Sequence, residues 1–521
     1  MVSLRDSLTY EPKEMGFGTS GLRDLVTVMT DLECYINTLG FLDFLLSHDL
    51  INSGDVVYVA GDLRDSTPRI TKAVMKAITD GGYQVEYNGL VPTPALAYRS
   101  FGRGAGIMVT GSHIPADRNG IKFNKPEGEV LKPDEIHIHE AVAKVRQRLY
   151  AEAFETSAFD ENGMLKQAPQ IPETTDVGAA YRERYTKVFA GQPLAGRKVV
   201  FYQHSAVGRD LLVELLGELG AEVVPVGRSE VFIPIDSENV KPEHQTYFRQ
   251  LAQENPGLFA IVSTDGDSDR PFVVDETGEF HRGDVLGAVV AHWLSADFAA
   301  YPISNSDASD IWLGNQGVPV THTKIGSPFV IAAMNEARAQ GKHNVVGWEA
   351  NGGFLIGSEL TINGQTLSPL ATRDAILPII VAMVVAIETQ VSISELFAKL
   401  PARFTSSGLI DNFPPETYKV ILEQLAHDTP EAKTKLAAFF TSEKGFGEIE
   451  KVNTLDGVRL YFANGDIAHL RQSSNAPQLR IYSVAGTQER ADEIASLALA
   501  EPDGIFRTIQ RQMSAISGII E

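Results

Sequence analysis

The sequence has almost no cysteine and no long apolar run. Cys34 is the single cysteine among 521 residues, so no intrachain disulfide can form, which suits a reducing compartment, and we expect a cytoplasmic protein. The N-terminus has no apolar segment typical of a secretory signal. The longest apolar run, Ala375 to Ile387, is far shorter than the roughly 18 residues of a membrane span and is flanked by charged residues. It predicts a buried helix, and we expect no membrane association.

Positive charge is also scarce. The chain has 45 Lys and Arg against 67 Asp and Glu, a formal net charge of −22. Such a surface repels nucleic-acid phosphates and anionic lipids, so neither is an expected partner. A ligand that carries phosphate must be held by local basic residues, by backbone amides or through a metal ion. The composition, 43% hydrophobic and 21% charged, is that of an ordinary globular protein.

Apolar strand-like runs alternate with helical patterns along most of the chain. The runs DVVYVAGD (Asp55 to Asp62) and AGIMVTGSH (Ala105 to His113) are examples from the first third. This alternation predicts an α/β fold of three related domains, each with a mixed sheet sandwiched by helices. The last part of the chain has a different pattern and predicts a smaller α+β domain. The predicted domains are residues 1–170, 171–282, 283–403 and 404–521.

Ligands collect at the carboxyl ends of strands in sheets of this class, and the first polar loop lies at such a place. An apolar run ends in Gly-Ser-His, and Ser112, His113, Asn119, Gly120 and Lys122 share one short loop. The serine is placed to act as a nucleophile or a phosphate carrier. Each residue alone has a structural alternative, because Gly-Ser is a common turn, a loop histidine is often satisfied locally and a lysine is often a solvated charge.

The second loop follows the apolar run LFAIV and carries aspartates at positions i, i+2 and i+4: Asp265, Asp267 and Asp269. This spacing can turn several carboxylate oxygens onto one hard cation and predicts a Mg²⁺ site. An EF-hand loop is rejected because Arg270 stands where that loop needs glycine, although Glu276 falls at its twelfth position. An aspartyl-nucleophile phosphatase loop is disfavoured because Asp269 replaces the usual threonine. A solvated acidic turn is the structural alternative.

Two further loops carry weaker signals. GWEANGG contains Glu349 and Asn351, which could form hydrogen bonds to neighbouring sugar hydroxyls, although Asn-Gly-Gly is more often a turn. The stretch HLRQSSNAPQLRIY has two arginines and no acidic residue, which is informative in so acidic a chain. Its guanidinium, hydroxyl and amide groups predict a phosphate-binding loop formed by Arg471, Ser473, Ser474, Asn475 and Arg480.

Together these loops, in this order, resemble the α-D-phosphohexomutase superfamily, the phosphomannomutase and phosphoglucomutase enzymes. The resemblance covers essentially the whole chain. It rests on FGTSGLRD, GDLRDSTP, GLVPTPAL, TGSHIPADRNGIKF, DGDSDR, GWEANGG and RQSSNAPQLRIY. The family fold has three related α/β domains and a smaller fourth one around a central cleft.

The resemblance implies a phosphosugar mutase that interconverts hexose 6-phosphate and hexose 1-phosphate. Ser112 would be the phosphoserine, and a hexose 1,6-bisphosphate would be the intermediate or activator. Mg²⁺ would be held by the three aspartates and a phosphoserine oxygen. Lys122 or His113 would carry the proton, and Arg23 and Arg270 would add positive field. Substrate would be bound by the residues of the third and fourth loops, by Arg270 and by Lys324.

The sugar identity stays open because the chain departs from the family pattern. The sugar loop lacks the serine and histidine of many mannose and glucose mutases, and Gly326-Ser327 stands where some relatives have Gly-His, with Lys324 nearby. A phosphomannomutase is preferred, with a phosphoglucomutase or a glucosamine phosphate mutase as alternatives. A non-catalytic sugar-phosphate-binding regulatory relative is the alternative from another class, and the intact Ser112 and Lys122 argue against it. The expected partners are hexose phosphates, and the oligomeric state stays open.

Overall fold

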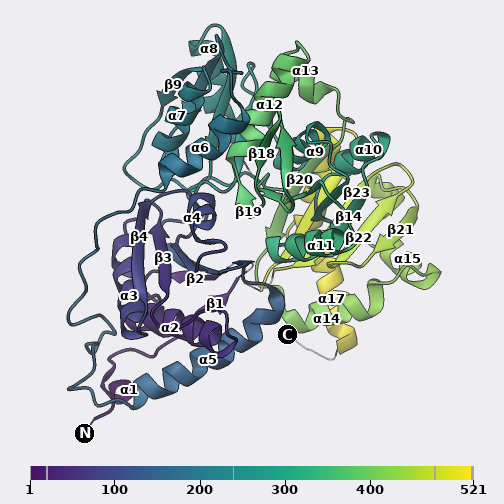
Figure 1. Cartoon of the computed structure of the whole chain (residues 1–521). Coiled ribbons are helices and arrows are strands. Elements are labelled where there is room, and N and C mark those ends of the chain that lie inside the picture. The colour runs from purple at the N-terminus through teal and green to yellow at the C-terminus, as the bar shows by residue number, and fades with distance from the viewer. Residues whose placement is uncertain (1, 19–20, 239, 474–476, 518–521) are drawn as a thin grey trace. The chain divides into compact units, whose positions relative to one another are not determined.

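The computed structural model describes residues 2–18, 21–238, 240–473 and 477–517 (Figure 1). Two compact units divide the chain, and each is described by itself. The larger unit comprises Met1–Ala299 and Gly326–Phe397, and the smaller unit comprises Ala300–Ile325 and Ala398–Glu521. These units do not correspond one to one with the four predicted domains, whose boundaries stay a prediction.

The first sheet of the larger unit has the order β1-β2-β6-β5-β3-β4, with β7 paired to β6. Strand β3 is parallel to β4 and β5, whereas β6 is antiparallel to β5 and β2, so the sheet is mixed. The strands are β1 (Gly16–Phe17), β2 (Leu22–Leu25), β3 (Val56–Gly61), β4 (Gln84–Leu90), β5 (Gly106–Val109), β6 (Arg118–Lys125) and β7 (Gly128–Glu129). The helices are α1 (Leu4–Ser7), α2 (Asp31–Ser47), α3 (Thr67–Asp80), α4 (Thr93–Ser100) and α5 (Lys132–Ala151).

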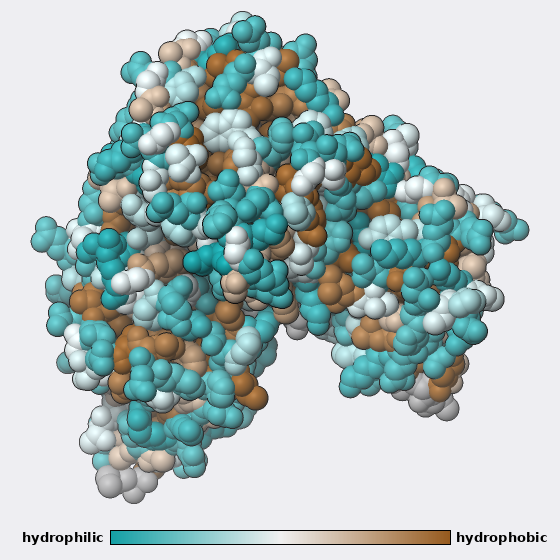
Figure 2. All heavy atoms as spheres, turned by 45° about the vertical axis from the view of Figure 1, so that its right-hand side comes forward, coloured by the Kyte–Doolittle hydropathy of each residue, from teal (hydrophilic) through white to brown (hydrophobic). Residues whose placement is uncertain are grey.

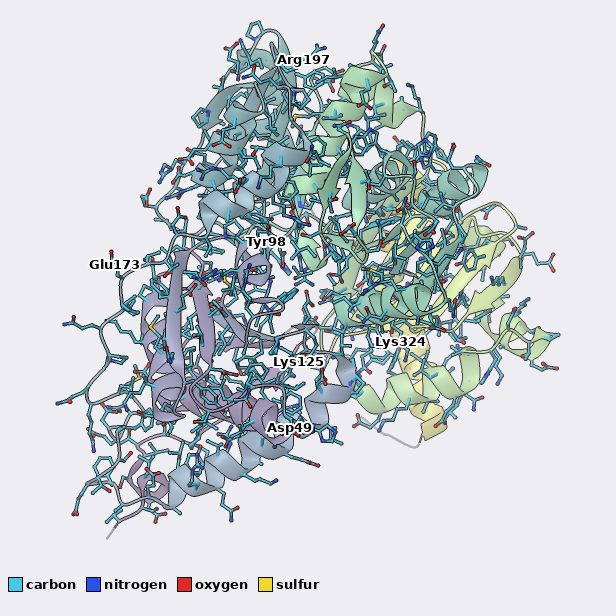
Figure 3. All side chains as sticks on the ribbon, viewed as in Figure 1. Asp49, Tyr98, Lys125, Glu173, Arg197 and Lys324 are labelled. Carbon is cyan, nitrogen blue, oxygen red and sulfur yellow. The ribbon has the colours of Figure 1, made fainter. Side chains whose placement is uncertain are left out.

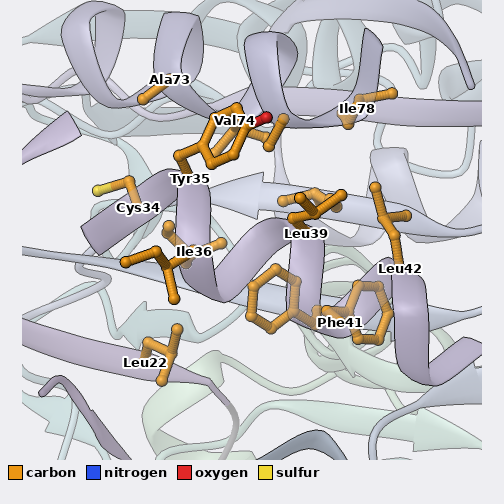
Figure 4. Packing of buried hydrophobic residues seen from close by; sticks show 14 of the residues in the cluster. Leu22, Cys34, Tyr35, Ile36, Leu39, Phe41, Leu42, Ala73, Val74 and Ile78 are labelled. Carbon is orange, nitrogen blue, oxygen red and sulfur yellow. The ribbon is translucent and has the colours of Figure 1, made fainter. Parts of the chain in front are cut away.

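Helix α2 forms the centre of the core under this sheet. It packs against both α3 and α5, and most of its residues are therefore buried. Figure 4 shows Ile36, Leu39 and Phe41 of α2 together with Val74 of α3 in this cluster. The helix begins after Thr30, whose hydroxyl accepts a hydrogen bond from the Glu33 amide at 3.3 Å. Residues of α2 and of the strands share this cluster, and the sheet carries the loops described below.

The second sheet has the order β12-β11-β10-β8-β9. Strand β8 is parallel to β9 and β10, and β10 forms an antiparallel pair with β11. The strands are β8 (Lys198–Tyr202), β9 (Glu222–Val226), β10 (Leu258–Thr264), β11 (Pro271–Val274) and β12 (Phe280–His281). The helices are α6 (Gly178–Val188), α7 (Arg209–Glu218) and α8 (Pro242–Glu254). The loop with three aspartates is the connection between β10 and β11.

The remaining part of the larger unit contains antiparallel pairs of β15 with β16, β16 with β19, and β17 with β18. Its strands are β15 (Val345–Trp348), β16 (Phe354–Ile356), β17 (Leu360–Ile362), β18 (Gln365–Leu367) and β19 (Leu370–Asp374). Its helices are α9 (Gly283–Trp293), α11 (Ser327–Ala339), α12 (Ile376–Glu388) and α13 (Ile393–Ala398), while β13 (Phe298–Pro302) spans the boundary between the units. The apolar run at residues 375–387 forms α12, which is buried over most of its length, so the predicted buried helix is confirmed.

The smaller unit is built on an antiparallel sheet with the order β20-β24-β23-β22-β21. These strands are β20 (Phe404–Ile410), β21 (Ile449–Asn453), β22 (Val458–Phe462), β23 (Ile467–Gln472) and β24 (Leu479–Ala485). The helices are α14 (Pro415–Leu425), α15 (Pro430–Ala437), a 3₁₀ turn (Ser442–Lys444), α16 (Gln488–Leu499) and α17 (Ile505–Ser517). The inserted segment contributes α10 (Asp307–Asn315) and β14 (Val320–Thr323) and is joined to the rest by an Arg403–Asp307 ion pair at 2.7 Å.

Most of the surface shown in Figure 2 consists of hydrophilic side chains, with apolar side chains in scattered groups. Within the described residues, no helix has the length and apolar character that crossing a membrane would require. The fold class predicted from the sequence, α/β domains with mixed sheets and a C-terminal α+β part, is confirmed.

Candidate active site

Three buried carboxylates form the centre of the candidate site. Asp265, Asp267 and Asp269 lie in the tight connection between β10 and β11, and each is fully buried. One carboxylate oxygen from each lies within 4.8 Å of the others. The tight connection brings them together because the three carboxylates come from five consecutive residues. The alternative of a solvated acidic turn is wrong, since none of the three is exposed.

Cations from other elements surround this cluster. Lys122 of β6 donates from Nζ to Asp267 Oδ2 at 2.5 Å and to Asp269 Oδ2 at 2.7 Å. Arg373 of β19 donates from Nε to Asp269 Oδ2 at 3.0 Å. The Nε atom of Arg270 lies 3.7 to 3.8 Å from carboxylate oxygens of the cluster. Lys122 is only 5% exposed, so the interpretation as a solvated charge is wrong.

The carboxylates retain free capacity for a metal ion. The Oδ1 atoms of Asp267 and Asp269 are buried and have no hydrogen-bond partner among the described residues. Buried carboxylate oxygens without a partner are costly, and a hard divalent cation is the ligand that such oxygens suit. The residues therefore fit a Mg²⁺-type ion, which the three carboxylates would hold.

Ser112 lies beside this cluster at the end of β5. It is fully buried, and its Oγ donates to Asp265 Oδ2 at 2.7 Å. His113 is next to it, with Nδ1 at 3.4 Å from Ser112 Oγ. The backbone of Ser112 has φ 52°, in the left-handed region that a residue with a side chain seldom adopts. The fold thus brings the first and second predicted loops together, 153 residues apart in sequence.

Burial and charge set the protonation of these groups. Burial raises the pKa of Asp265 well above its ordinary value, and the negative charges of Asp267 and Asp269 act in the same direction. Burial opposes ionisation of Asp269 too, but Arg373 and Lys122 outweigh it and hold the pKa of that carboxyl low. The surroundings therefore shift the pKa values of Asp265 and Asp269 in opposite directions.

The basic residues respond to the same field. Burial lowers the pKa of His113 well below its ordinary value, and the nearby Arg270 and Arg23 lower it further. Burial also lowers the pKa of Arg23 to about 10, again helped by Arg270 and Arg373. Arg23 lies in β2, where it pairs with Gly120 of β6. The predicted catalytic residues Ser112, Lys122, His113 and Arg23 therefore share one environment.

The loop of residues 349–353, predicted to contact the sugar and called the sugar loop below, connects β15 and β16 and is tied to the aspartate cluster. Arg373 Nη1 donates to Glu349 Oε2 at 2.9 Å, so one guanidinium bridges this loop and Asp269. Asn351 is largely used within the protein, because its Oδ1 accepts from the Gly353 amide at 3.0 Å and its Nδ2 donates to Glu238 at 3.1 Å. Glu349 is thus placed beside the site, whereas Asn351 shapes its own loop.

Sequence reasoning missed two residues of this site. Arg373 comes directly after the apolar part of β19, so the rule about strand ends could have found it. Its Nη1 also donates to Ser327 Oγ at 3.2 Å, and Ser327 in turn donates to Glu129 at 2.7 Å. Thr93 was also missed, although its hydroxyl donates to Asp267 Oδ2 at 2.6 Å. Arg373, Thr93 and Lys122 line one pocket, together with Glu129 and Thr372.

The predicted phosphate-binding residues belong to the smaller unit. Arg471 of β23 lies opposite Arg480 of β24 and forms an ion pair with Asp456, Nε to Oδ2 at 2.9 Å. The same Asp456 oxygen accepts from the amide of Ile325 at 2.9 Å, directly after the exposed Lys324 (Figure 3). Ser473 follows directly after β23, which ends at Gln472. Ser474 and Asn475 lie outside the described residues.

Comparisons with known proteins agree along the chain. Family models match residues 14–149 (Phosphoglucomutase/phosphomannomutase, alpha/beta/alpha domain I), residues 180–278 (domain II) and residues 282–404 (domain III).

Individual relatives match over almost their whole length. The chain is 39% identical over 487 residues to a phosphomannomutase of Sinorhizobium fredii, covering 93% of this chain and 98% of the relative. It is 39% identical over 493 residues to a phosphomannomutase of Salmonella muenchen, covering 93% and 95%. A crystal structure of a phosphoglucomutase/phosphomannomutase family protein from Burkholderia thailandensis has the same fold, with a TM-score of 0.68 at 18% identity over 99% of this chain and 98% of that one.

Proposed function

The chain belongs to the phosphoglucomutase/phosphomannomutase family, and we propose that it interconverts hexose 6-phosphate and hexose 1-phosphate through a phosphorylated Ser112 and a hexose 1,6-bisphosphate. The observation that carries this proposal is the contact of Ser112 Oγ with Asp265 at 2.7 Å, beside a carboxylate cluster that has free oxygens. Transfer of a phosphoryl group to and from a serine is stabilised by positive charge, which a metal ion held by these carboxylates would supply. Mannose phosphate is the preferred substrate, because both relatives at 39% identity are named phosphomannomutase.

The residues around Ser112 have separable tasks in this reaction. Bound Mg²⁺, held by Asp265, Asp267 and Asp269, would supply positive charge that neutralises the transferring phosphoryl group. Lys122 fixes two of these carboxylates through their Oδ2 atoms and leaves their Oδ1 atoms without a hydrogen bond among the described residues. Arg23 and Arg270 add further positive charge near the serine, and Glu349 is the proposed acceptor for a sugar hydroxyl. Lys122 and His113 are the two proposed proton carriers.

The proposed substrate-binding residues outside the larger unit are Lys324, Arg471, Ser473 and Arg480, with Ser474 and Asn475 retained as sequence predictions. Arginines opposite one another on neighbouring strands repel each other, and a phosphate dianion would relieve that repulsion. This chemistry supports a role for the loop in holding the phosphate that does not react.

Mass spectrometry and kinetics together test this function. The purified protein is incubated with a hexose 1,6-bisphosphate, and we expect one phosphoryl group on Ser112. Turnover is then measured side by side with mannose 1-phosphate, glucose 1-phosphate and glucosamine 1-phosphate, and the highest kcat/KM identifies the sugar. A protein that binds these sugar phosphates but neither becomes phosphorylated nor turns them over would instead be the regulatory relative.

A further inference from the structure

Arg64, in the GDLRDSTP segment between β3 and α3, is buried behind the serine loop with its side chain only 1% exposed. A guanidinium has five N–H donors, and in Arg64 all five are used. Nε donates to Asp62, and the other four go to backbone carbonyls of the loop that carries the serine. These are the carbonyl oxygens of Ser112 (2.8 Å), Ile114 (2.6 Å), Pro115 (2.7 Å) and Arg118 (2.8 Å).

Close packing fixes the guanidinium on its other sides. The ring of Phe232 lies over it, with 3.8 Å between Cζ and the ring centroid. A Cβ on Gly111 would lie 2.6 Å from Arg64 Cζ, so only glycine fits there. A Cβ on Gly266, in the aspartate loop, would lie 2.7 Å from the Ser112 carbonyl oxygen and 2.8 Å from Phe232. Arg64 is thus packed between the serine loop and residues of the second sheet region.

The same segment holds the serine loop from its amide side. The Ser112 amide donates to Thr110 Oγ1 at 2.8 Å, and Thr110 donates to Asp62 Oδ2 at 2.8 Å. Asp62 also binds Arg64, so these two side chains hold residue 112 from both sides: Arg64 binds its carbonyl oxygen, and Asp62 binds its amide through Thr110. These contacts explain how Ser112 can keep its left-handed backbone conformation, which costs free energy and persists only where the surrounding structure enforces it.

We propose that Arg64 is a positioning residue, which holds Ser112 in its left-handed conformation so that Oγ points at the aspartate cluster. The proposal rests on the proposed function of Ser112 as phosphoryl carrier. Arg64 itself does not touch the reacting oxygen, since its contacts are with backbone carbonyl groups, with Asp62 and with the ring of Phe232. Its loss should therefore misplace the serine while leaving the groups that bind the sugar in place.

The test compares Arg64→Lys with Arg69→Lys. Lysine keeps the charge but cannot supply the planar fork of five donors. Arg69 is a matched control, because it also bonds a carboxylate and backbone carbonyls, those of Val26 and Met29, but none of the serine loop. We expect Arg64→Lys to lower kcat, and the rate of Ser112 phosphorylation by hexose 1,6-bisphosphate, on the order of 100-fold, with KM changed less than about threefold. Arg69→Lys should leave these rates within about threefold of wild type.

A second variant guards against misfolding of Arg64→Lys. Phe232→Leu removes the ring that covers the guanidinium, contributed by the loop between β9 and α8, and should give the same pattern, a lower kcat at unchanged KM, but only several-fold in size. The proposal is overturned if Arg64→Lys keeps the wild-type phosphorylation rate, if its defect lies in KM, or if Arg69→Lys is equally impaired. Failure of the wild-type protein to phosphorylate Ser112 would instead overturn the proposed function.

Discussion

The aspartate cluster of the larger unit and the Arg471–Asp456 ion pair of the smaller unit differ in how deeply their charges are buried. Asp265, Asp267 and Asp269 are fully buried and meet Lys122 and Arg373 from distant parts of the chain. The Arg471 and Asp456 side chains are 16% and 18% exposed and form a single ion pair within one unit.

This difference separates a fixed arrangement from an exchangeable one. Buried charges interact strongly, and removing one partner leaves the others uncompensated, typically at a cost of about 3–5 kcal/mol. The Arg471–Asp456 ion pair is less buried than the aspartate cluster and its charges are better screened by solvent, so a phosphate can replace its carboxylate partner. We therefore expect substitutions in the aspartate cluster to impair turnover, and substitutions at Arg471 to impair binding.

The largest effect should come from Ser112→Ala. It removes the proposed phosphoryl carrier and leaves the surrounding charges in place, so kcat should fall by about three orders of magnitude or more while sugar phosphate still binds. Steady-state kinetics and calorimetric titration with mannose 1-phosphate check the two halves of this expectation. Near-normal turnover by the variant would refute the phosphoserine.

Asp267→Asn should follow, with a loss of several hundred-fold in kcat. The amide keeps the volume but removes a charge that interacts with Lys122 and with the proposed metal ion, so the concentration of Mg²⁺ needed for half-maximal activity should rise as well. A Mg²⁺ titration of activity measures both quantities, and Asp210→Asn, on the surface of α7, is a control. Full activity of the wild-type protein in excess chelator would contradict the metal site.

Arg373→Lys should lower kcat on the order of 100-fold. The lysine keeps one charge but cannot reach Asp269 and Glu349 at the same time, which releases both the aspartate loop and the sugar loop. Because Arg146 is another buried arginine bonded to a carboxylate, Glu33 at 2.5 Å, Arg146→Lys controls for loss of stability alone. Kinetics and thermal unfolding of both variants decide whether the effect is local.

Arg471→Ala should act mainly on binding. A hydrogen bond to a charged group contributes about 1.5–3 kcal/mol, so kcat/KM should fall about 10- to 100-fold, mostly through a higher KM. If affinity for the sugar phosphate is unchanged, the phosphate is bound elsewhere. A larger fall in kcat than that of Arg373→Lys would break the distinction between the two regions.

Asp456→Asn should have the smallest effect, and it should lower KM where Arg471→Ala raises it. It removes the charge that competes with phosphate for Arg471 but keeps the oxygen that accepts from the Ile325 amide, so KM should fall by about two- to fivefold. The decrease should vanish in Asp456→Asn combined with Arg471→Ala. A raised KM in the single variant would show that Asp456 chiefly positions the arginine.

Local pattern was sufficient for much of this structure. The alternation of strands and helices predicted the fold class, and strand ends predicted Ser112 and the three aspartates, because both signals are short in sequence. The contacts of the aspartates could not be predicted: Lys122 was a predicted site residue, but its bond to Asp267 spans 145 residues, and Arg373, which was missed, is 104 residues from Asp269. Contacts between residues so far apart in sequence depend on how the sheets pack together, and no local pattern encodes that packing. For the same reason the sequence suggested a sugar contact for Asn351, whose side chain is engaged by its own loop and by Glu238.

The smaller unit is formed by two segments of the chain that are synthesised at different times. Residues 300–325 leave the ribosome long before residues 398–521, yet Asp307, Asn305 and Ile325 find their partners at Arg403, Arg459 and Asp456. The nascent chain must therefore carry these three residues without those partners until the last part of the chain has been made. A chain truncated before residue 398 should expose that segment and be recognised by chaperones, whereas the full-length protein should escape them once its last strands are made.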